Sequence, residues 1–444
     1  MRPSAAVRLA ACPIFLLSLA AGTLFAQSPA EDPNQAEIGI TVSGVAPRQI
    51  PLVIPPVQVK PRAGSEATRA AKLIREIIAS DLTYSGLFNV LPPSLYANVT
   101  IASGRVPLRE FSAIGAVGVV TASVGTREDD ELIVEGLLFD SKTEALITGK
   151  RYRGAARLAR DIAHRISNAV TIAYTGKAGV YLSRVVFVGK IGQAKEIFVM
   201  DYDGSDLKQI TNNKTLNISP TWSPDGRRLA FVSYRMGSPR LYIYDGKDGR
   251  LTDGSPEGSE LCIAPDWSPD GRYIAFSSSS KGNSEIFIMD VSTQRSRRIS
   301  FSRGTDTSPD WSPSGREIVF TSDRTGRPQL YLMDAEGANV RKLTDTGDFS
   351  DSGAWSPSGD KIAYASRIRG RFEILIMDVA SREVHVLTQN SRNNESPRWS
   401  PDGRHIIFSS NRTGTYQVYT MDVDGNRQEP ISTEFEATMP DWSR

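Results

Sequence analysis

Cysteine and histidine are both scarce in this chain of 444 residues, which contains two cysteines and three histidines. If an export signal removes Cys12, Cys262 remains alone and an internal disulfide is excluded. The histidines are scattered, without the partner spacing that a metal site or a catalytic triad needs: His164, His385 and His405. We therefore expect no catalytic residue, no metal ion and no cofactor.

An excess of charge of one sign is also lacking. Loss of residues 1–26 would remove Arg2 and Arg8 from the 52 basic residues, which leaves them equal in number to the 50 acidic residues. Recognition of nucleic acid needs a basic surface, so nucleic acid is not an expected partner. No apolar run beyond the N-terminus reaches the roughly 18 residues that a membrane-spanning helix needs.

Residues 1–26 have the pattern of a secretory signal peptide. Arg2 and Arg8 precede an apolar stretch from Pro13 to Leu19, and the small residue Ala26 marks the predicted cleavage point. Residues 9–12 also match a lipoprotein cleavage box, but the apolar stretch follows this box instead of preceding it. We therefore favour export with removal of residues 1–26 over attachment of a lipid.

All six tryptophans of the chain occur in one recurring phrase, which reads Trp-Ser-Pro-Asp-Gly in its full form. They are separated by 45, 44, 44, 44 and 43 residues: Trp222, Trp267, Trp311, Trp355, Trp399 and Trp442. A repeat of about 40–45 residues with a fixed aromatic signature is typical of a β-propeller with one four-stranded blade per repeat. The fold class is therefore predicted to be mainly β, with a propeller in the C-terminal part.

Each repeat predicts four antiparallel strands. The tryptophan ends the inner strand, and the Pro-Asp-Gly or Pro-Ser-Gly turn leads to a second strand such as Leu229–Phe231. A third strand such as Ile286–Met289 follows, and a short outer strand ends at pairs such as Ile299-Ser300 and Leu343-Thr344. The tryptophans and the aromatic residues of these strands are expected to pack in the core and not to act on a ligand.

The two ends of the repeat array indicate how the ring closes. The first repeat, near Val185, lacks a tryptophan phrase, whereas the last phrase, Pro440-Asp441-Trp442, lacks a repeat. The simplest arrangement lets the C-terminal strand complete the first blade. This closes a six-bladed ring and leaves no exposed sheet edge that would invite aggregation.

The remaining chain divides into three parts. Residues 27–36 are polar and are predicted to be flexible. Residues 37–175 are predicted to form a small α+β domain, because they combine strand-like runs with two amphipathic helices. Residues 176–183 form the expected hinge, and residues 184–444 form the propeller.

Within the α+β part, Ser65 is expected to precede a first helix that runs through Ala79, and the second helix is expected from Ala155 to Tyr174. A compact buried strand is expected at Leu52–Ile54, and Glu37–Val42 alternates polar and apolar residues. Three further strands are expected at Val117–Thr126, Glu131–Phe139 and Ala145–Arg153.

Nearly the whole exported chain resembles the TolB family of the Tol-Pal envelope system. The resemblance rests on Asp81-Leu82, Ser85-Gly86-x-Phe88, the helix running into Thr175-Gly176, the joint Tyr181–Arg184 and the six tryptophan repeats. It implies a periplasmic, monomeric binding protein without catalysis. The implied partners are the outer-membrane, peptidoglycan-associated lipoprotein Pal and the inner-membrane protein TolA, and the implied role is outer-membrane integrity and invagination during cell division.

The resemblance also implies two binding regions. The segment that would bind TolA is Glu37, Ile38, Gly39, Ile40, Thr41 and Val42, preceded here by about ten extra residues. Its docking on the protein body and its release for TolA would be coupled to Pal binding. The positions that match Pal contacts precede the second and third full tryptophan phrases: Leu261, Ala264, Thr307 and Ser308.

Strand alternation puts the loops between outer and next inner strands on the same face as the loops between second and third strands. The first set is acidic: Glu257, Glu260, Asp306, Asp348, Asp351, Glu395, Glu434 and Glu436. The second set is basic: Arg235, Lys281, Arg324, Arg327, Arg367, Arg369, Arg371 and Arg412. An acidic ring with a basic periphery would steer a partner of mixed charge, although loop charges that only keep the surface soluble would look the same. We expect Glu260, Asp306, Asp351 and Glu395 to contribute to the Pal-binding face.

Two other kinds of function are alternatives to this interpretation. A hydrolase gated by a propeller needs a further catalytic domain with a Gly-x-Ser-x-Gly elbow, which this sequence does not contain. The sequences Asp201–Gly204 and Asp422–Gly425 hint at calcium loops but lack the distal ligands, so turns are favoured. A generic peptide- or carbohydrate-binding propeller outside the Tol-Pal system is the alternative that the repeats alone leave open.

Overall fold

The computed structural model describes residues 49–61, 63–99, 101, 105–127, 131–255, 261–279, 282–345, 347–389, 392–431 and 435–444. The chain divides into two units, residues 1–45 and residues 46–444. The predicted signal peptide, the flexible segment and the segment Glu37–Val42 all lie outside the described residues. All that follows concerns the second unit.

The N-terminal part of this unit is an α+β structure built on one sheet with the strand order β3-β1-β4-β5-β6. Its strands are β1 (Ile50–Val53), β2 (Gln58–Val59), β3 (Phe88–Val90), β4 (Gly118–Thr126), β5 (Leu132–Asp140) and β6 (Leu146–Gly154). Strand β1 pairs in parallel with β3 and β4, whereas β4, β5 and β6 form an antiparallel run. The short strand β2 pairs with β4.

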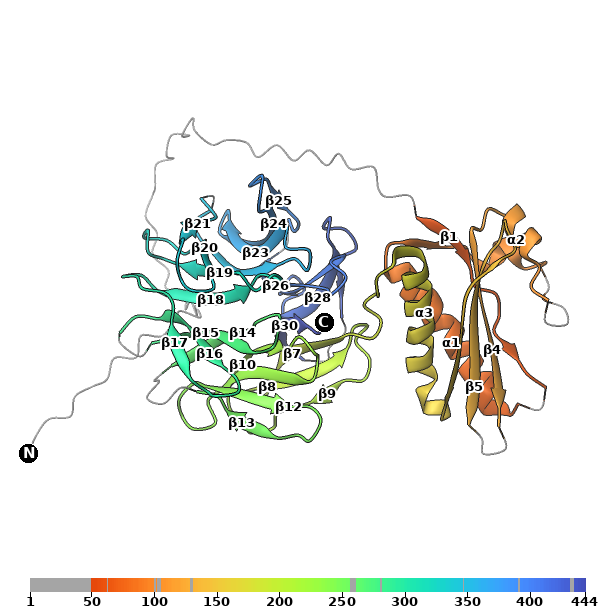
Figure 1. The fold of residues 1–444 in the computed structure, drawn as a ribbon, viewed down its shortest axis with the longest axis horizontal. Helices are drawn as coiled ribbons and strands as arrows, with labels where there is room; N and C mark the ends of the chain where they lie inside the picture. Colours follow the sequence, from red (N-terminus) through yellow and green to blue (C-terminus); the bar gives the residue numbers. More distant parts are fainter. Residues whose placement is uncertain are drawn as a thin grey trace, which may run out of the picture. The chain divides into compact units, whose positions relative to one another are not determined.

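Two long helices, α1 (Ser65–Tyr84) and α3 (Ala159–Thr175), pack against this sheet and contact each other (Figure 1). Their apolar faces are buried through Ile74 and Ile78 of α1 and through Ile162 and Ile166 of α3. The remaining helical turns are short: η1 (Pro93–Tyr96), α2 (Leu108–Ala113) and η2 (Ala156–Leu158). Mixed strands with two amphipathic helices therefore form the layered α+β structure that the sequence predicts.

The helix limits differ from the prediction in ways that have a local cause. Helix α1 runs five residues past Ala79, because Leu82 is buried on the same apolar face and Ser85 caps the helix before Gly86 turns left-handed. Ser65 lies inside the helix, and Gly64 takes the cap position. The second helix begins with the 3₁₀ turn η2 and becomes α-helical only at Ala159.

The C-terminal part is a ring of six four-stranded sheets, each antiparallel, as predicted (Figure 1). The first blade joins β30 (Ala437–Trp442) to β7 (Arg184–Ile191), β8 (Ala194–Asp201) and β9 (Lys208–Gln209). The second consists of β10 (Asn217–Trp222), β11 (Arg228–Ser233), β12 (Arg240–Asp245) and β13 (Leu251–Asp253). The third consists of β14 (Cys262–Trp267), β15 (Tyr273–Ser278), β16 (Glu285–Asp290) and β17 (Ser296–Arg298).

The other three blades repeat the same order of strands. The fourth consists of β18 (Asp306–Trp311), β19 (Glu317–Ser322), β20 (Gln329–Asp334) and β21 (Arg341–Lys342). The fifth consists of β22 (Ser350–Trp355), β23 (Lys361–Ile368), β24 (Arg371–Asp378) and β25 (Val384–Val386). The sixth consists of β26 (Asn394–Trp399), β27 (His405–Ser410), β28 (Gln417–Asp422) and β29 (Glu429–Pro430).

The predicted closure of the ring is confirmed by the pairing of the C-terminal strand with the first blade. Trp442 of β30 lies opposite Val185 of β7, and Ala437 lies opposite Gly189. Beyond the strand, the backbone N–H of Ser443 donates to the carbonyl of Arg184 at 2.8 Å. Residues 259 positions apart are therefore held together, and β7 does not present an open edge.

Each inner strand contains a bulge that the sequence analysis does not predict. The residue three positions before every tryptophan has a positive φ between 49° and 56°: Ser219, Ala264, Ser308, Ser352, Ser396 and Met439. The strand register shifts at the same place in each blade. A bulge turns the strand locally and changes the direction of its side chains.

The α+β part and the propeller share a buried polar contact. The Asp81 carboxylate accepts a hydrogen bond from the Tyr202 hydroxyl at 2.5 Å and lies 2.9 Å from His164 Nδ1. Nearby, Tyr84 stacks on His405, and its hydroxyl lies 2.7 Å from the Thr420 hydroxyl. Asp81, one of the residues on which the family resemblance rests, thus joins α1 to α3 and to the first blade.

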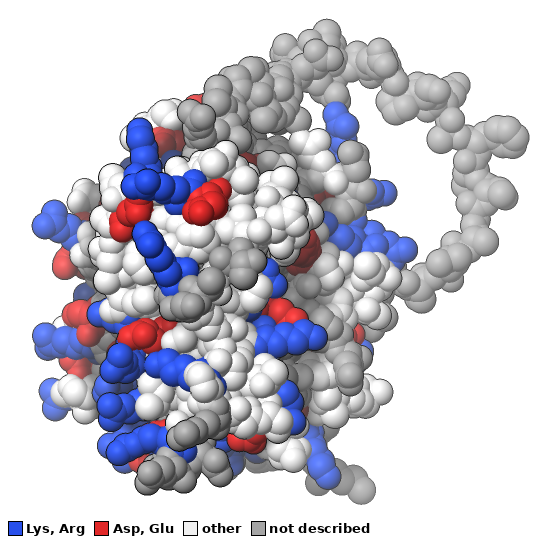
Figure 2. Space-filling view, turned by 90° about the vertical axis from the view of Figure 1, so that its right-hand side faces the viewer, with Lys and Arg blue, Asp and Glu red and all other residues white. Residues whose placement is uncertain are grey.

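No helix among the described residues is long and apolar enough to cross a membrane. Figure 2 shows that basic and acidic side chains are intermingled on the face it presents, in keeping with the balanced composition of the chain.

Candidate functional site

The channel of the ring is lined by all six tryptophans and by a few charged groups. It contains a cavity of about 250 Å³ next to Asp266, Asp310, Arg398 and Asp441. The tryptophans are 3–8% exposed, which agrees with the predicted packing role. The prolines of the tryptophan phrases also line this cavity, so it lies toward the turns that follow the inner strands.

The charged groups of the channel tie the blades to one another. Asp266 accepts a hydrogen bond from the backbone N–H of Trp311 at 2.8 Å, and Asp310 accepts one from Trp355 at 2.9 Å. Arg398 donates to Asp310 at 2.7 Å. Burial raises the pKa of Asp310, whereas Arg398 and the Trp355 N–H act in the opposite direction.

The opposite end of the blades carries the loops between second and third strands and the loops between outer and next inner strands. We call this end the loop face. Hydrogen bonds join the two kinds of loop, as predicted from strand alternation: the Asn283 side chain donates to the carbonyls of Ser302 and Gly304 at 2.9 and 2.7 Å. The backbone N–H of Asp306 donates to the Ser284 carbonyl at 2.8 Å.

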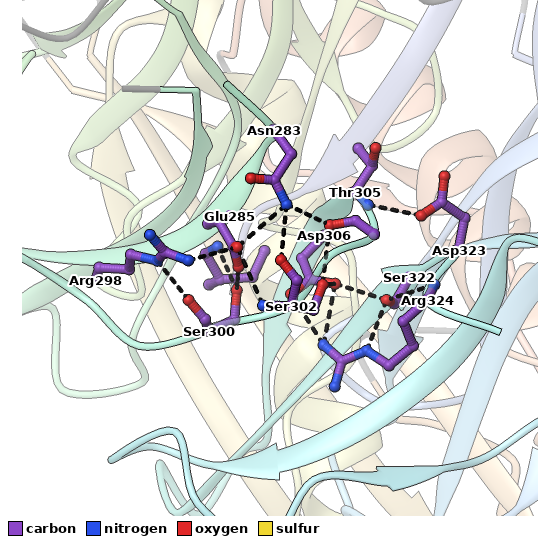
Figure 3. Close-up of polar contacts among 12 residues, drawn as sticks. Asn283, Glu285, Arg298, Ser300, Ser302, Thr305, Asp306, Ser322, Asp323 and Arg324 are labelled. Carbon is purple, nitrogen blue, oxygen red and sulfur yellow. Dashed lines mark hydrogen bonds and ion pairs between the residues drawn. The ribbon is translucent and has the colours of Figure 1, made fainter. Parts of the chain in front are cut away.

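A buried carboxylate at the start of β16 holds the loop between the third and fourth blades. Glu285 is 2% exposed and accepts hydrogen bonds from Arg298 and from the Ser300 hydroxyl, both at 2.6 Å. It also accepts one from the backbone N–H of Ser302 at 3.1 Å. Burial raises the pKa of Glu285, and the serine donors act against this. Figure 3 shows Arg298 and the two serines converging on this carboxylate.

The fourth and fifth blades contain the same kind of buried hydrogen-bonded side chain at the start of their third strands. Eighteen residues after Trp311 and Trp355 lie Gln329 and Glu373, and each accepts a hydrogen bond at 2.6 Å from a threonine 15 residues further on. These threonines, together with Ser300, are the residues predicted to end the outer strands. Strands β17 and β21 instead end one residue before their Ile-Ser and Leu-Thr pairs, because the hydroxyls turn inward to the buried side chain.

Asp306 differs from its predicted role as an exposed member of an acidic ring. Its side chain is fully buried and pairs with Arg324, whose nitrogen lies 3.0 and 2.9 Å from the two carboxylate oxygens. The Ser322 hydroxyl donates to it at 2.6 Å. Asp306 is therefore shielded from solvent in this structure, and Arg324 is a clamp instead of a peripheral charge. Figure 3 shows this pair beside the Glu285 cluster.

The other predicted loop charges differ in how far they are exposed. Asp351 accepts a hydrogen bond from Thr321 at 2.7 Å, and Glu395 accepts one from Tyr416 at 2.8 Å. Burial raises the pKa of Glu395. Arg412 turns inward and donates to Asn394 and Gln428. Several predicted basic residues are exposed on this face: Arg235, Arg327, Arg367, Arg369 and Arg371.

The residues that match Pal contacts lie along the inner ends of two loops. Thr307, Ser308 and Ala264 are partly exposed, and Ser308 and Ala264 occupy the left-handed bulge position of their strands. Leu261 is partly exposed directly before β14. Glu257, Glu260, Lys281 and Glu434 lie outside the described residues. The structure thus brings Ala264 and Ser308 to equivalent points of neighbouring blades, with Thr307 directly before Ser308.

Sequence reasoning missed the glutamate and glutamine clamps under the loops. A signal was present, because Glu285, Gln329, Glu373 and Gln417 recur at a spacing of 44 residues. A polar residue at a fixed position of an otherwise apolar strand indicates a buried, satisfied side chain. Among the described residues, no group of three or more His, Cys, Asp or Glu side chains is arranged to hold a metal ion.

Fold and site together define a six-bladed β-propeller protein with an N-terminal α+β part and a loop face on which buried polar side chains hydrogen-bond to the described loops. Residues 173–444 match the family described as the TolB beta propeller domain, and residues 38–147 match the TolB amino-terminal domain. The chain belongs to the TolB family.

Several relatives show the same likeness. The Tol-Pal system protein TolB of Dinoroseobacter shibae is 34% identical over 255 residues, which cover 55% of this chain and 56% of that protein. The corresponding protein of Roseobacter denitrificans is 32% identical and covers 52% and 53%. The chain thus spans about half the length of these curated relatives. The crystal structure of TolB from Acinetobacter baumannii is 28% identical, with a TM-score of 0.77, over 89% of this chain and 97% of that one.

Proposed function

We propose that this protein is a non-enzymatic, periplasmic binding component of the Tol-Pal system. It would bind a Pal-type peptidoglycan-associated lipoprotein through the loop face and a TolA-type inner-membrane protein through residues 37–42. In this role it supports outer-membrane integrity and inward movement of the outer membrane at division. Membership of the TolB family, with both of its domains matched in one chain, supports the proposal.

The observation that carries the choice of surface is the set of buried hydrogen bonds that hold the loop between the third and fourth blades. A protein that binds through preorganised loops loses less conformational entropy on association. The buried side chains of Glu285 and Asp306 each hold a loop through three or more hydrogen bonds. The surface around Thr307 and Ser308 is thereby presented in one arrangement.

The proposed limits of the parts, residues 37–175 for the α+β domain and 184–444 for the propeller, belong to the same proposal. So does the switch in which residues 37–42 are released for TolA when Pal binds. Such coupling requires that the two ligands have different affinities for the two states of the segment. Deletion of residues 27–44 should change the affinity for both partners, and unchanged affinities would contradict the switch.

A pull-down of the exported protein from detergent-solubilised envelopes, followed by mass spectrometry, tests the function. We expect recovery of a peptidoglycan-associated lipoprotein and of a TolA-type protein. A matched sample with Thr307 replaced by Arg should retain less of the lipoprotein, because Thr307 is partly exposed on the proposed surface. If the folded protein retains neither partner, a propeller that binds other peptides or carbohydrates becomes the better account.

A further inference from the structure

A phenylalanine protrudes from the loop face. Phe301, in the loop between β17 and β18, is 74% exposed, and Met236, in the loop between β11 and β12, is 72% exposed. They are the two most exposed large hydrophobic residues in the described part of the chain. Ile191, the last residue of β7, and Leu216, directly before β10, are 46% and 39% exposed at the same end of the blades.

Single exposed apolar residues are common and need no explanation, but Phe301 is held in place. The Arg298 guanidinium carbon lies 4.5 Å from the centroid of the phenylalanine ring. Arg298 in turn donates to the buried Glu285 at 2.6 Å and to the Ser300 carbonyl at 2.7 Å. Arg298 is therefore held in place by its hydrogen bonds, and its cation–π contact orients the Phe301 ring.

The backbone around Phe301 is fixed as well. The N–H of the next residue, Ser302, donates to Glu285, and the Asn283 side chain donates to the Ser302 carbonyl. The Ser302 hydroxyl donates to the Gly304 carbonyl at 2.9 Å. Hydrogen bonds thus restrain both flanks of an exposed aromatic residue, as Figure 3 shows for the loop beneath it.

We propose that Phe301 is an aromatic anchor through which the loop face grips its protein partner. Aromatic side chains that enter a pocket of the partner often supply much of the binding energy, and a fixed ring costs little entropy on binding. The inference rests on the proposed function, because it takes the Pal-type lipoprotein as the partner. It adds a specific contact five residues before the predicted position Asp306 and six before Thr307.

The charges near Phe301 define the kind of pocket that fits. Arg303, two residues further along the loop, is exposed, and Arg235 is exposed on the same face. The acidic partners of this region, Glu285 and Asp306, are buried and neutralised by Arg298 and Arg324. The partner should therefore offer an apolar pocket with acidic groups at its rim, since complementary charges favour docking.

Titration calorimetry with the soluble, lipid-free domain of the Pal-type lipoprotein tests this anchor. We expect Phe301→Ala to weaken binding at least tenfold, and Phe301→Tyr to restore most of the affinity because the ring remains. The matched control is Leu207→Ala, which removes a 45% exposed side chain from the turn between β8 and β9, away from the loop face. Since Phe301 is exposed, its variants should keep the wild-type tryptophan fluorescence and thermal midpoint.

The outcomes separate the anchor from the function on which it rests. If the wild type and Phe301→Ala bind the lipoprotein with the same affinity, Phe301 is not an anchor, but the proposed function stands. Absence of wild-type binding to the lipoprotein overturns both. The protein could instead bind soluble peptidoglycan fragments through Phe301 and not bind the lipoprotein. That result would overturn the proposal of a protein partner and indicate a sugar ligand.

Discussion

At the scale of single residues, the polar side chains that matter most are buried beneath the loops. Asp306 and Glu285 hold chain segments in place, whereas Thr307, Ser308 and the exposed Phe301 face solvent beside them. Breaking a buried ion pair leaves an uncompensated charge, which costs more than breaking an exposed pair. The energetic difference between these two kinds of pair can be measured.

Asp306→Asn should lower the free energy of unfolding of the propeller by about 2–3 kcal/mol, because Arg324 loses its charged partner in a mostly buried site. The matched control is Asp348→Asn, which removes the exposed partner of Arg327 and should cost no more than about 0.5 kcal/mol. Urea unfolding followed by tryptophan fluorescence reports the propeller, because all six tryptophans lie there. Equal changes in the free energy of unfolding would contradict a stabilising role of the buried Asp306–Arg324 pair.

The pKa of Asp266 is raised by burial, with a further increase from Asp310 and an opposing effect of Arg398. A carboxyl group whose pKa is higher in the folded chain stabilises the fold below its unfolded pKa and loses that contribution as the pH rises through the folded pKa. Asp266→Asn cannot ionise, so its stability relative to the wild type should increase from pH 4 to pH 7. Urea midpoints at both pH values measure this change.

Asp378 provides the opposite control, because its pKa is lowered mainly by the backbone N–H of Ser381. Its stabilising contribution is present above the unfolded pKa and is lost as the pH falls through the folded pKa. The stability of Asp378→Asn relative to the wild type should therefore decrease as the pH rises from 2 to 5 and stay nearly constant from pH 5 to pH 7. The same trend in both variants would refute the assigned causes.

At the scale of the strand, the inner strands combine regular pairing with a strained residue. A left-handed backbone costs roughly 1–2 kcal/mol for a residue with a Cβ atom, and glycine avoids this cost. The strain recurs at the same position of all six inner strands, including Ser308 and Ala264 on the proposed partner surface. The bulge turns these side chains, so it shapes the surface as well as the strand.

Ser308→Gly should raise the free energy of unfolding by about 0.5 kcal/mol, because relief of strain slightly exceeds the added flexibility of glycine in the unfolded chain. Thr307→Gly, at the neighbouring residue of β18 without a positive φ, should lower it by about 1 kcal/mol. Urea unfolding measures both variants. Destabilisation of the same size at both positions would argue against strain at Ser308.

Much of the element order follows from sequence alone. The six tryptophans, the turns after them and the unmatched C-terminal phrase predict six blades and their closure, because strand alternation and edge pairing leave few alternatives. The bulge at Ser308 escapes prediction because serine does not mark a left-handed backbone as glycine would. The burial of Asp306 could not be predicted either, since the sequence around a charged loop residue does not show which arginine pairs with it.

At the scale of the whole molecule, the ring depends on one strand supplied by the far end of the chain. A protein that ends at Glu436 would lose β30, with the buried Ala437 and Trp442, and would expose the edge of β7. An open strand edge promotes association between molecules. Removal of Arg444 alone leaves this strand and Ser443 in place, so it serves as the control.

We expect the free energy of unfolding of the shorter protein to be lower by at least about 3 kcal/mol, since loss of a buried tryptophan side chain alone costs this much. It should also form oligomers in size-exclusion chromatography, whereas the control stays like the full chain. Fluorescence of the remaining tryptophans follows the unfolding. A monomeric truncated protein of unchanged stability would show that β30 does not close the ring.

The central claim is that the loop face, and not the turn end of the propeller, binds the lipoprotein. Hydrogen exchange of the full exported chain, measured by mass spectrometry with and without the lipid-free Pal-type domain, tests it most directly. We predict protection of the backbone around residues 299–308 and no change in the turn at residues 400–404. Protection confined to the turn at 400–404, with residues 299–308 exchanging as before, would contradict the account.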